Sequence, residues 1–280
     1  MPVPAPNETR VWFVTGASSG FGRAICEEVL SRGDQLVATS RDPASLAELA
    51  DRAIAVRLDV TDPDDARTVM QRAEQDTGGV DVVVNNAGYG HVGAIEELTD
   101  DELRRQLDVN LYGVLNVTRA ALPYFRSRRS GRFLQMSSLN GIEALPGGAY
   151  YTASKFAVEG FSEALAAEVA HLGIGVTIVE PGPHRTSFAQ AGSMPSAEPM
   201  PEYAESVGEV RQLLAQLDGH QPGDPARAAK AIVDVGSSDD PPLRLPLGAM
   251  AHDHIRAKLH RQLDDLEAVA PLGATDYPST

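Results

Sequence analysis

The sequence predicts an α/β fold with one doubly wound, mostly parallel sheet of about seven strands and helices on both faces. Two observations support this prediction. Short, nearly continuous apolar runs recur about every 20 to 25 residues over the first 180 residues, and segments of helical periodicity separate them. Strands of a parallel sheet are buried on both faces and have this apolar character. Because neither an internal repeat nor a low-complexity linker divides the 280 residues, we expect a single domain over residues 1–280.

Seven short apolar segments are the predicted strands. In chain order they are residues 11–15, 36–39, 53–58, 80–84, 132–136, 176–179 and 243–245. Apolar residues at helical spacing predict the helices. The helical segments include residues 24–30, 98–125, 156–169, 225–235 and 250–269. Asp42-Pro43 and Asp62-Pro63 each resemble a helix cap followed by proline at the first helical position.

Charge and cysteine content exclude several classes of function. The formal net charge is -15, whereas binding to nucleic acid or an anionic membrane needs a basic surface, so we expect neither. The single cysteine, Cys26, cannot form an internal disulfide, which fits a reducing cytoplasm and an inert, packed thiol. Residues 1–7 lack the pattern of a signal peptide, and no apolar run of about 18 residues indicates a membrane span. We also expect no metal site.

A glycine-rich turn follows the first predicted strand. It reads Thr15-Gly16-Ala17-Ser18-Ser19-Gly20-Phe21-Gly22 and leads into a helix. The pyrophosphate of a dinucleotide needs a backbone without Cβ atoms and a helix N-terminus directed at its charge. Tight turns need glycine as well, but the place of this turn, between the first strand and its helix, favours phosphate binding.

The end of the second predicted strand indicates which dinucleotide binds. An acidic residue there would accept hydrogen bonds from a ribose 2′-hydroxyl, whereas an arginine would pair with a 2′-phosphate. Ser40 stands at the acidic position and Arg41 follows it, which favours NADP(H) over NAD(H). In the alternative interpretation, Arg41 only faces solvent beside the next helix.

A second small-residue segment, Asn85-Asn86-Ala87-Gly88, follows the fourth predicted strand. Small side chains and amides at the carboxyl end of a strand suit packing beside a cofactor, because ligands of α/β folds bind there. Asparagine pairs also occur in ordinary turns.

Tyr151 and Lys155 are four residues apart at the start of a predicted helix and therefore share one face. A free phenol titrates near pH 10, and a nearby ammonium favours the phenolate and lowers its pKa. Because the chain has 7 tyrosines and 3 lysines, chance predicts roughly 0.08 such pairs. The alternative is a solvated helix face beside a core tyrosine.

Two polar residues can complete this arrangement. Ser138, at the end of the fifth predicted strand, can hydrogen-bond a substrate oxygen near the phenol, although a surface turn would look the same. Asn110 is a poor helix former inside a long predicted helix, where it can bend the helix or hold a water for Lys155.

Together these motifs resemble the short-chain dehydrogenase/reductase family, strongly over about residues 10–190. Thr15–Gly22 is similar to the family's TGxxxGxG turn, with Phe21 where isoleucine or leucine is commoner, and Asn85–Gly88 is similar to its NNAG motif. The remaining matches are Asp59 with Val60 near the adenine, Pro181-Gly182 with Thr186 around the nicotinamide, and the tetrad Asn110, Ser138, Tyr151 and Lys155.

The resemblance implies a Rossmann-like fold and a mechanism. NADPH would deliver hydride to a ketone or aldehyde, Ser138 would polarise the carbonyl oxygen and Tyr151 would donate the proton. Lys155 would lower the pKa of Tyr151 and bind the nicotinamide ribose, and Asn110 would hold a water that replaces the proton. Family members commonly form dimers or tetramers through two long helices, here about residues 100–128 and 150–171, so a homodimer or homotetramer is expected.

Within the family, Ala38–Asp42 and Val179–Pro183 look most like hydroxysteroid- and retinol-dehydrogenase-like members. Residues 186–222, rich in proline and methionine, are expected to cover the substrate. Candidates to line its pocket are Tyr89, His91, Glu143, His184 and Phe188, each with a structural role as the alternative.

Two other functions are weighed against this carbonyl or alcohol oxidoreductase. A non-enzymatic NADP-binding regulator on the same fold should have lost Tyr151 or Lys155, and both are present. An epimerase or dehydratase usually needs a larger C-terminal substrate domain than 280 residues provide. The natural substrate is not readable from the sequence.

Overall fold

A computed structural model describes residues 9–189 and 193–273, and in these residues it confirms the predicted parallel sheet. Seven strands lie in the order β3-β2-β1-β4-β5-β6-β7, and each neighbouring pair is parallel. Their bounds are β1 Val11–Val14, β2 Gln35–Ser40, β3 Ile54–Arg57, β4 Val82–Asn85, β5 Gly131–Met136, β6 Ile174–Pro181 and β7 Arg244–Leu247. The strand order reverses between β1 and β4, which is where such sheets bind ligands.

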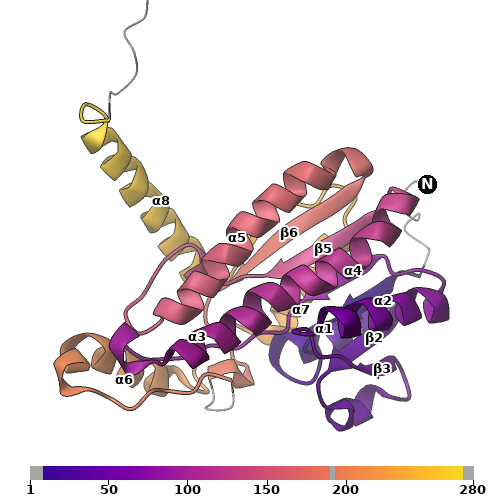
Figure 1. The fold of residues 1–280 in the computed structure, drawn as a ribbon, viewed down its shortest axis with the longest axis horizontal. Helices are drawn as coiled ribbons and strands as arrows, with labels where there is room; N and C mark the ends of the chain where they lie inside the picture. Colours follow the sequence, from indigo (N-terminus) through magenta and orange to yellow (C-terminus); the bar gives the residue numbers. More distant parts are fainter. Residues whose placement is uncertain (1–8, 190–192, 274–280) are drawn as a thin grey trace, which may run out of the picture.

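Helices cover both faces of the sheet (Figure 1). One face packs against α1 (Gly20–Ser31) and α7 (Pro225–Gly236), and the other against α2 (Pro63–Thr77), α4 (Gly113–Arg128) and α5 (Ala149–Val169). The remaining helices are α3 (Asp100–Leu107), α6 (Glu209–Leu217) and α8 (Ala249–Val269). No helix in the described residues has the length and apolar character that crossing a membrane requires.

Residues of β1 show why the strands read as continuous apolar runs. Trp12 and Val14 pack toward α1 and α7, whereas Val11 and Phe13 pack toward α2 and α4. All four are buried. A strand covered on both faces needs an apolar residue at every position, which removes the alternation of a half-exposed strand.

The two aspartate–proline pairs begin different kinds of helix. The Asp62 carboxylate accepts hydrogen bonds from the backbone N–H groups of Asp64 (2.8 Å) and Asp65 (3.2 Å), and α2 follows as predicted. Asp42 caps the 3₁₀ turns of Pro43–Leu49 instead of an α-helix. Leu46 and Leu49 are both buried, and their spacing of three suits the three residues per turn of a 3₁₀ helix.

The long helix predicted over residues 98–125 is interrupted. A π turn, Asp108–Tyr112, lies between α3 and α4 and contains Asn110. Apolar periodicity continues through both helices, so the pattern alone does not reveal one additional residue in a turn.

Candidate active site

The glycine turn after β1 is built so closely that two positions exclude any side chain. Gly16 has φ +64°, and a Cβ there would lie 2.9 Å from the Cα of Ala87. A Cβ on Gly22 would lie 2.1 Å from the carbonyl oxygen of Gly16. Gly20 also has a positive φ, of +54°. The turn thus presents bare backbone at the start of α1, as dinucleotide phosphates require.

The segment after β4 holds this turn in place. The Asn86 side-chain amide donates to the carbonyl oxygens of Thr15 (3.0 Å) and Gly16 (3.1 Å). The backbone N–H groups of Asn86 and Ala87 donate to the Thr15 hydroxyl at 2.9 and 3.0 Å. The structure therefore brings together the two motifs that the sequence placed at the ends of β1 and β4.

Arg41 and Asp59 lie at the carboxyl ends of β2 and β3. Arg41 is exposed and pairs with no carboxylate among the residues described, so its guanidinium is available. Partial burial raises the pKa of Asp59, but hydrogen bonds from Thr61 and the charge of Arg41 outweigh this and leave the pKa below its ordinary value. Val60 is buried against Gly113. These residues fit the far end of the site, where an adenosine ribose would lie in this fold.

Ser138, Tyr151 and Lys155 are all buried where β5 ends and α5 begins. The Lys155 ammonium donates to the carbonyl oxygen of Met136 (2.7 Å) and lies 5.7 Å from the centre of the Tyr151 ring. The Ser138 side chain interacts with the Tyr151 phenol and accepts a hydrogen bond from the N–H of Asn140 (3.1 Å). The three side chains therefore form one constellation.

Burial controls the protonation of this pair. Loss of solvation raises the pKa of Tyr151 to about 12, and the Ser138 side chain opposes this rise. Loss of solvation lowers the pKa of Lys155 to about 8, against the charge of Glu159. Burial thus opposes the lowering of the Tyr151 pKa that is expected from Lys155 and leaves that pKa above its ordinary value in the protein by itself.

Asn110 links the tyrosine helix to the segment after β4. Its side-chain oxygen accepts from the N–H of Tyr89 (3.0 Å), and its amide donates to the carbonyl of Tyr89 (2.8 Å) and to Ser154 (2.9 Å). The Ser154 hydroxyl donates in turn to the carbonyl of Tyr151 (2.7 Å). Because both amide donors are engaged, Asn110 positions its neighbours. That it also holds a water for Lys155 stays a prediction.

Comparison with known proteins agrees with this geometry. Residues 10–195 match the sequence profile of the family described as short chain dehydrogenase. This chain belongs to that family. It is therefore an oxidoreductase of a family that binds nicotinamide dinucleotides.

Three similar proteins illustrate the relationship. The oxidoreductase calM of Penicillium decumbens is 41% identical, over 95% of this chain and 92% of its own length. A 3-ketodihydrosphingosine reductase of Bacteroides thetaiotaomicron is 34% identical, over 87% of this chain and 89% of its own length. A short-chain dehydrogenase crystal structure from Streptomyces avermitilis is 42% identical with a TM-score of 0.89, covering 97% of this chain and all of that chain.

In this short-chain dehydrogenase, the segment after β6 returns to the glycine turn. Pro181 ends the strand, and the Gly182 N–H donates to the carbonyl of Leu247 (3.0 Å). A Cβ on Gly20 would lie 3.7 Å from the Cβ of Thr186. Thr186 is therefore placed against the turn that would hold the phosphates.

Phe188 of the predicted covering segment lies against Tyr151, and residues 190–192 of that segment lie outside the described part. The rings of Phe188 and Tyr151 are 5.7 Å apart. The sequence did not point to two residues of this region, Gly90 and Met194. A Cβ on Gly90 would lie 3.3 Å from the Tyr151 ring and 3.1 Å from the Met194 side chain. Met194 stands in a segment without periodicity, so no local signal could have identified it.

The other pocket candidates are occupied by neighbours. His91 is buried and hydrogen-bonds Gln106 (2.7 Å), with the ring of half-buried Tyr89 5.3 Å away. Glu143 is turned to α8, where it pairs with His254 (2.7 Å) and Arg261. His184 packs edge-on against Phe21, 5.0 Å between ring centres.

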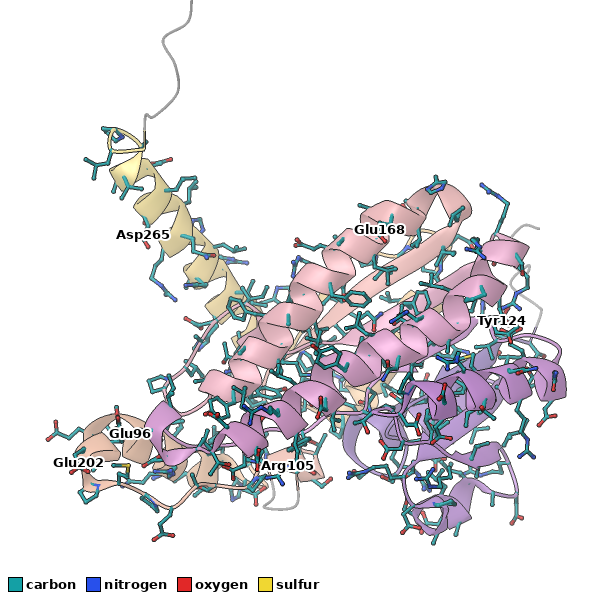
Figure 2. All side chains as sticks on the ribbon, viewed as in Figure 1. Glu96, Arg105, Tyr124, Glu168, Glu202 and Asp265 are labelled. Carbon is teal, nitrogen blue, oxygen red and sulfur yellow. The ribbon has the colours of Figure 1, made fainter. Side chains whose placement is uncertain are left out.

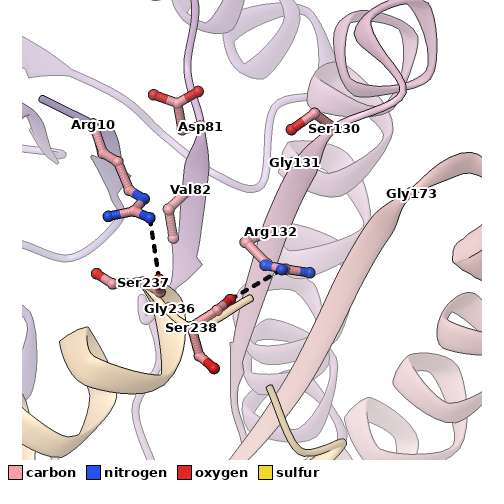
Figure 3. Close-up of a pocket in the computed structure, with 10 residues that line it drawn as sticks. All are labelled: Arg10, Asp81, Val82, Ser130, Gly131, Arg132, Gly173, Gly236, Ser237 and Ser238. Carbon is pink, nitrogen blue, oxygen red and sulfur yellow. Dashed lines mark hydrogen bonds between the residues drawn. The ribbon is translucent and has the colours of Figure 1, made fainter. Parts of the chain in front are cut away.

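A hollow at the opposite, amino-terminal edge of the sheet carries no ligand chemistry (Figure 3). Arg10 donates to the carbonyl of Ser237 (3.1 Å), and Arg132 donates to that of Ser238 (3.0 Å). Both guanidinium groups thus satisfy carbonyls at the end of α7. The hollow has a volume of about 20 Å³, which suits one water.

Proposed function

We propose that this chain is an NADP(H)-dependent oxidoreductase that interconverts a ketone or aldehyde and the corresponding alcohol. The observation that carries the proposal is the buried constellation of Ser138, Tyr151 and Lys155 beside the bare-backbone glycine turn. The relative whose printed name is 3-ketodihydrosphingosine reductase supports a carbonyl substrate. A place in the hydroxysteroid- and retinol-dehydrogenase-like subgroup is part of the proposal and rests on residues 38–42 and 179–183.

Bound NADPH would supply the hydride for the carbonyl carbon. The Ser138 hydroxyl donates a hydrogen bond to the carbonyl oxygen, and the Tyr151 phenol gives it a proton. A phenol with a pKa of about 12 is protonated at neutral pH, so it is ready to act as the acid of the reduction. Lys155 holds ribose hydroxyls and then stabilises the phenolate that remains. The main chain of the π turn around Asn110 would hold the water that returns a proton.

The preference for NADP(H) rests on Arg41. Its guanidinium is exposed and free of carboxylate partners among the described residues, at the end of β2. Ser40 stands where an acidic residue would repel a 2′-phosphate, and its hydroxyl contacts that of Ser45 (3.0 Å). A planar guanidinium pairs well with a phosphate dianion.

Two features of the surroundings belong to the same proposal. Residues 186–222 act as the cover of the substrate pocket, supported by the contact of Phe188 with Tyr151. Tyr112 and Phe156 are exposed near α4 and on α5, helices that lie side by side (Figure 1), which supports a homodimer or homotetramer through this surface. Location in the cytoplasm stays a prediction from the cysteine content.

The Tyr151→Phe variant tests the catalytic assignment, with Tyr150→Phe as a matched control. Tyr151→Phe should lower kcat by at least about 100-fold, because it removes the acid, and should leave the Kd of NADPH nearly unchanged. Tyr150 is equally buried, but its hydroxyl donates to the carbonyl of Leu98 (3.3 Å), so Tyr150→Phe should keep kcat. Turnover of a ketone panel, followed by NADPH absorbance, measures both. Wild-type kcat in Tyr151→Phe would overturn the proposal.

A further inference from the structure

The outer part of α8 has no covered face. Ala251 is the one buried residue of this helix, and every residue from Leu259 to Gly273 is exposed. Its main contacts are with β7 and the turn Leu139–Gly141, and Glu143 anchors it through His254 and Arg261. Beyond these contacts α8 projects from the body of the protein (Figure 1).

This projecting helix carries an apolar stripe. Leu259, Leu263, Leu266 and Val269 are 55%, 51%, 64% and 51% exposed, and with Ile255 they recur at the spacing of one helix face. A short helix without tertiary contacts is marginally stable in water, and exposed leucines add no stability. The stripe therefore needs a surface that covers it.

The charges beside the stripe indicate what that surface is. Lys258 and Asp265 lie on one side of the stripe, two turns apart, and Arg256 and Glu267 lie on the other side, three turns apart. Each side is thus basic toward the N-terminus of α8 and acidic toward its C-terminus. Among the described residues, the ion pairs of α8 are those of His254 and Arg261 with Glu143, so these four charges are unpaired. Figure 2 shows Asp265 on the projecting part.

We propose that α8 pairs with α8 of a second copy of this chain, antiparallel and about a two-fold axis. In this register Leu259 packs on Leu263 of the partner subunit, and Ile255 packs on the partner's Leu266. Lys258 then faces the partner's Asp265, and Arg256 faces the partner's Glu267. The symmetry makes each contact twice.

Other arrangements fit these charges less well. A parallel pair places basic residues beside basic ones and acidic beside acidic, so it gains none of the four ion pairs. The acidic outer half, with Asp264 next to Asp265 and Glu267, disfavours an anionic lipid surface. A second copy is the occupant that complements both halves of the helix.

A cysteine at the centre of α8 tests the pairing directly. Gln262 lies on the apolar side at the midpoint of the proposed register, next to the two-fold axis. Cys26, the natural cysteine, is buried and its thiol pKa is raised to about 12, so an introduced thiol is the accessible one. With a short bismaleimide, the full-length Gln262→Cys protein should give covalent dimers. Ala268→Cys, on the opposite side of the helix, is the matched control and should give about tenfold fewer.

Substitutions in the Gln262→Cys protein then test the register. Leu263→Asp should abolish crosslinking. Lys258→Glu and Asp265→Lys should each lower the yield severalfold, and the double variant should recover it, because the exchanged charges pair again across the axis. Equal crosslinking of Gln262→Cys and Ala268→Cys would overturn the proposal. A double variant whose crosslinking yield is no higher than that of either single variant would also overturn it. So would a Gln262→Cys protein that does not crosslink but binds phosphatidylserine vesicles, if Leu263→Asp removes that binding.

Discussion

A buried group of charged residues lies one helical turn beyond Lys155. Glu159 faces β6 and β7, where Arg244 bonds Glu159 (2.5 Å) and also Glu180. Burial raises the pKa of Glu159 to about 7, and the nearby Glu180 adds to the rise, against the Ser137 hydroxyl and the Arg244 guanidinium. A single arginine thus contacts two buried carboxyl groups and balances one of them, and a proton on Glu159 removes the remaining negative charge.

The raised pKa predicts a pH-dependent stability. Because the folded-state pKa lies above the ordinary 4.5, the favourable contribution of protonated Glu159 is complete below pH 4.5 and is lost as the pH rises through about 7. Glu159→Gln cannot lose a proton, so its Tm relative to wild type should increase by a few degrees between pH 5 and pH 8. Thermal unfolding over this range measures it.

Glu163→Gln is the control for this comparison. Glu163 also bonds Arg244, but its side chain is 55% exposed, so its Tm difference should not vary with pH. If the Tm values of wild type and Glu159→Gln changed in parallel with pH, the raised pKa of Glu159 would be contradicted.

Arg41 predicts a change in cofactor preference. Wild type should bind NADPH more tightly than NADH. Arg41→Ala should raise the Kd of NADPH by about 10- to 100-fold, because a charge-assisted hydrogen bond is lost, and should change the Kd of NADH little. Fluorescence titration with each dinucleotide gives the Kd values. Arg57→Ala, at the end of β3 and paired with Asp65 (3.1 Å), should leave both nearly unchanged. Tighter NADH binding by wild type would refute the preference for NADP(H).

At the scale of elements, one ion pair joins α6, which belongs to the proposed covering segment, to the residues before α3. The Glu97 carboxylate is fully buried and accepts hydrogen bonds from Arg211 of α6 (2.7 Å) and from the N–H groups of Ala94 (2.6 Å) and Met200 (2.8 Å). The Arg211 guanidinium is the largest cause of a Glu97 pKa lowered to about 2. The pair therefore holds α6 against the segment before α3.

Removal of the ion pair between Arg211 and Glu97 should make the proposed covering segment more mobile. Arg211→Met leaves the carboxylate without its cation, so residues 193–217 should be cleaved severalfold faster in limited proteolysis and KM should rise more than kcat falls. Arg104→Met, which breaks an exposed pair with Asp100, should cleave at the wild-type rate. Unchanged proteolysis of Arg211→Met would show that the cover is held elsewhere.

At the scale of the whole molecule, the proposed assembly uses two separate surfaces. Phe156, 43% exposed on α5, belongs to the surface shared with α4, whereas the leucine stripe belongs to α8. Phe156→Glu should therefore lower the solution mass of the assembly by half, because it places a charge in an apolar interface. Light scattering after gel filtration measures the mass.

The same substitution separates the two surfaces. In a Gln262→Cys background, Phe156→Glu should keep the α8 crosslink while the mass falls. If Phe156→Glu removed the α8 crosslink as well as lowering the mass, α8 would pair only when the α4–α5 surface is also assembled.

The succession of strands along the chain could be predicted from the sequence, because burial on both faces of a strand and on one face of a helix leaves a repeating pattern of apolar residues. It also indicates the chemical groups of the proposed site: the glycine turn and the pair Tyr151–Lys155 stand out by residue type and spacing, and Ser138 by the resemblance to the family. These are local properties, set by backbone geometry within a few residues.

The interactions between residues far apart in the chain could be known only from the fold. Burial, and not the neighbouring ammonium, dominates the pKa of Tyr151. The amide of Asn110 hydrogen-bonds Tyr89 and Ser154, Glu143 pairs with residues of α8, and Met194 and Tyr151 both lie against Gly90. The apolar stripe of α8 reads in the sequence as an ordinary core-facing helix, and only the fold shows that the core does not reach it. Solvation and pairing depend on neighbours far along the chain, which local pattern does not record.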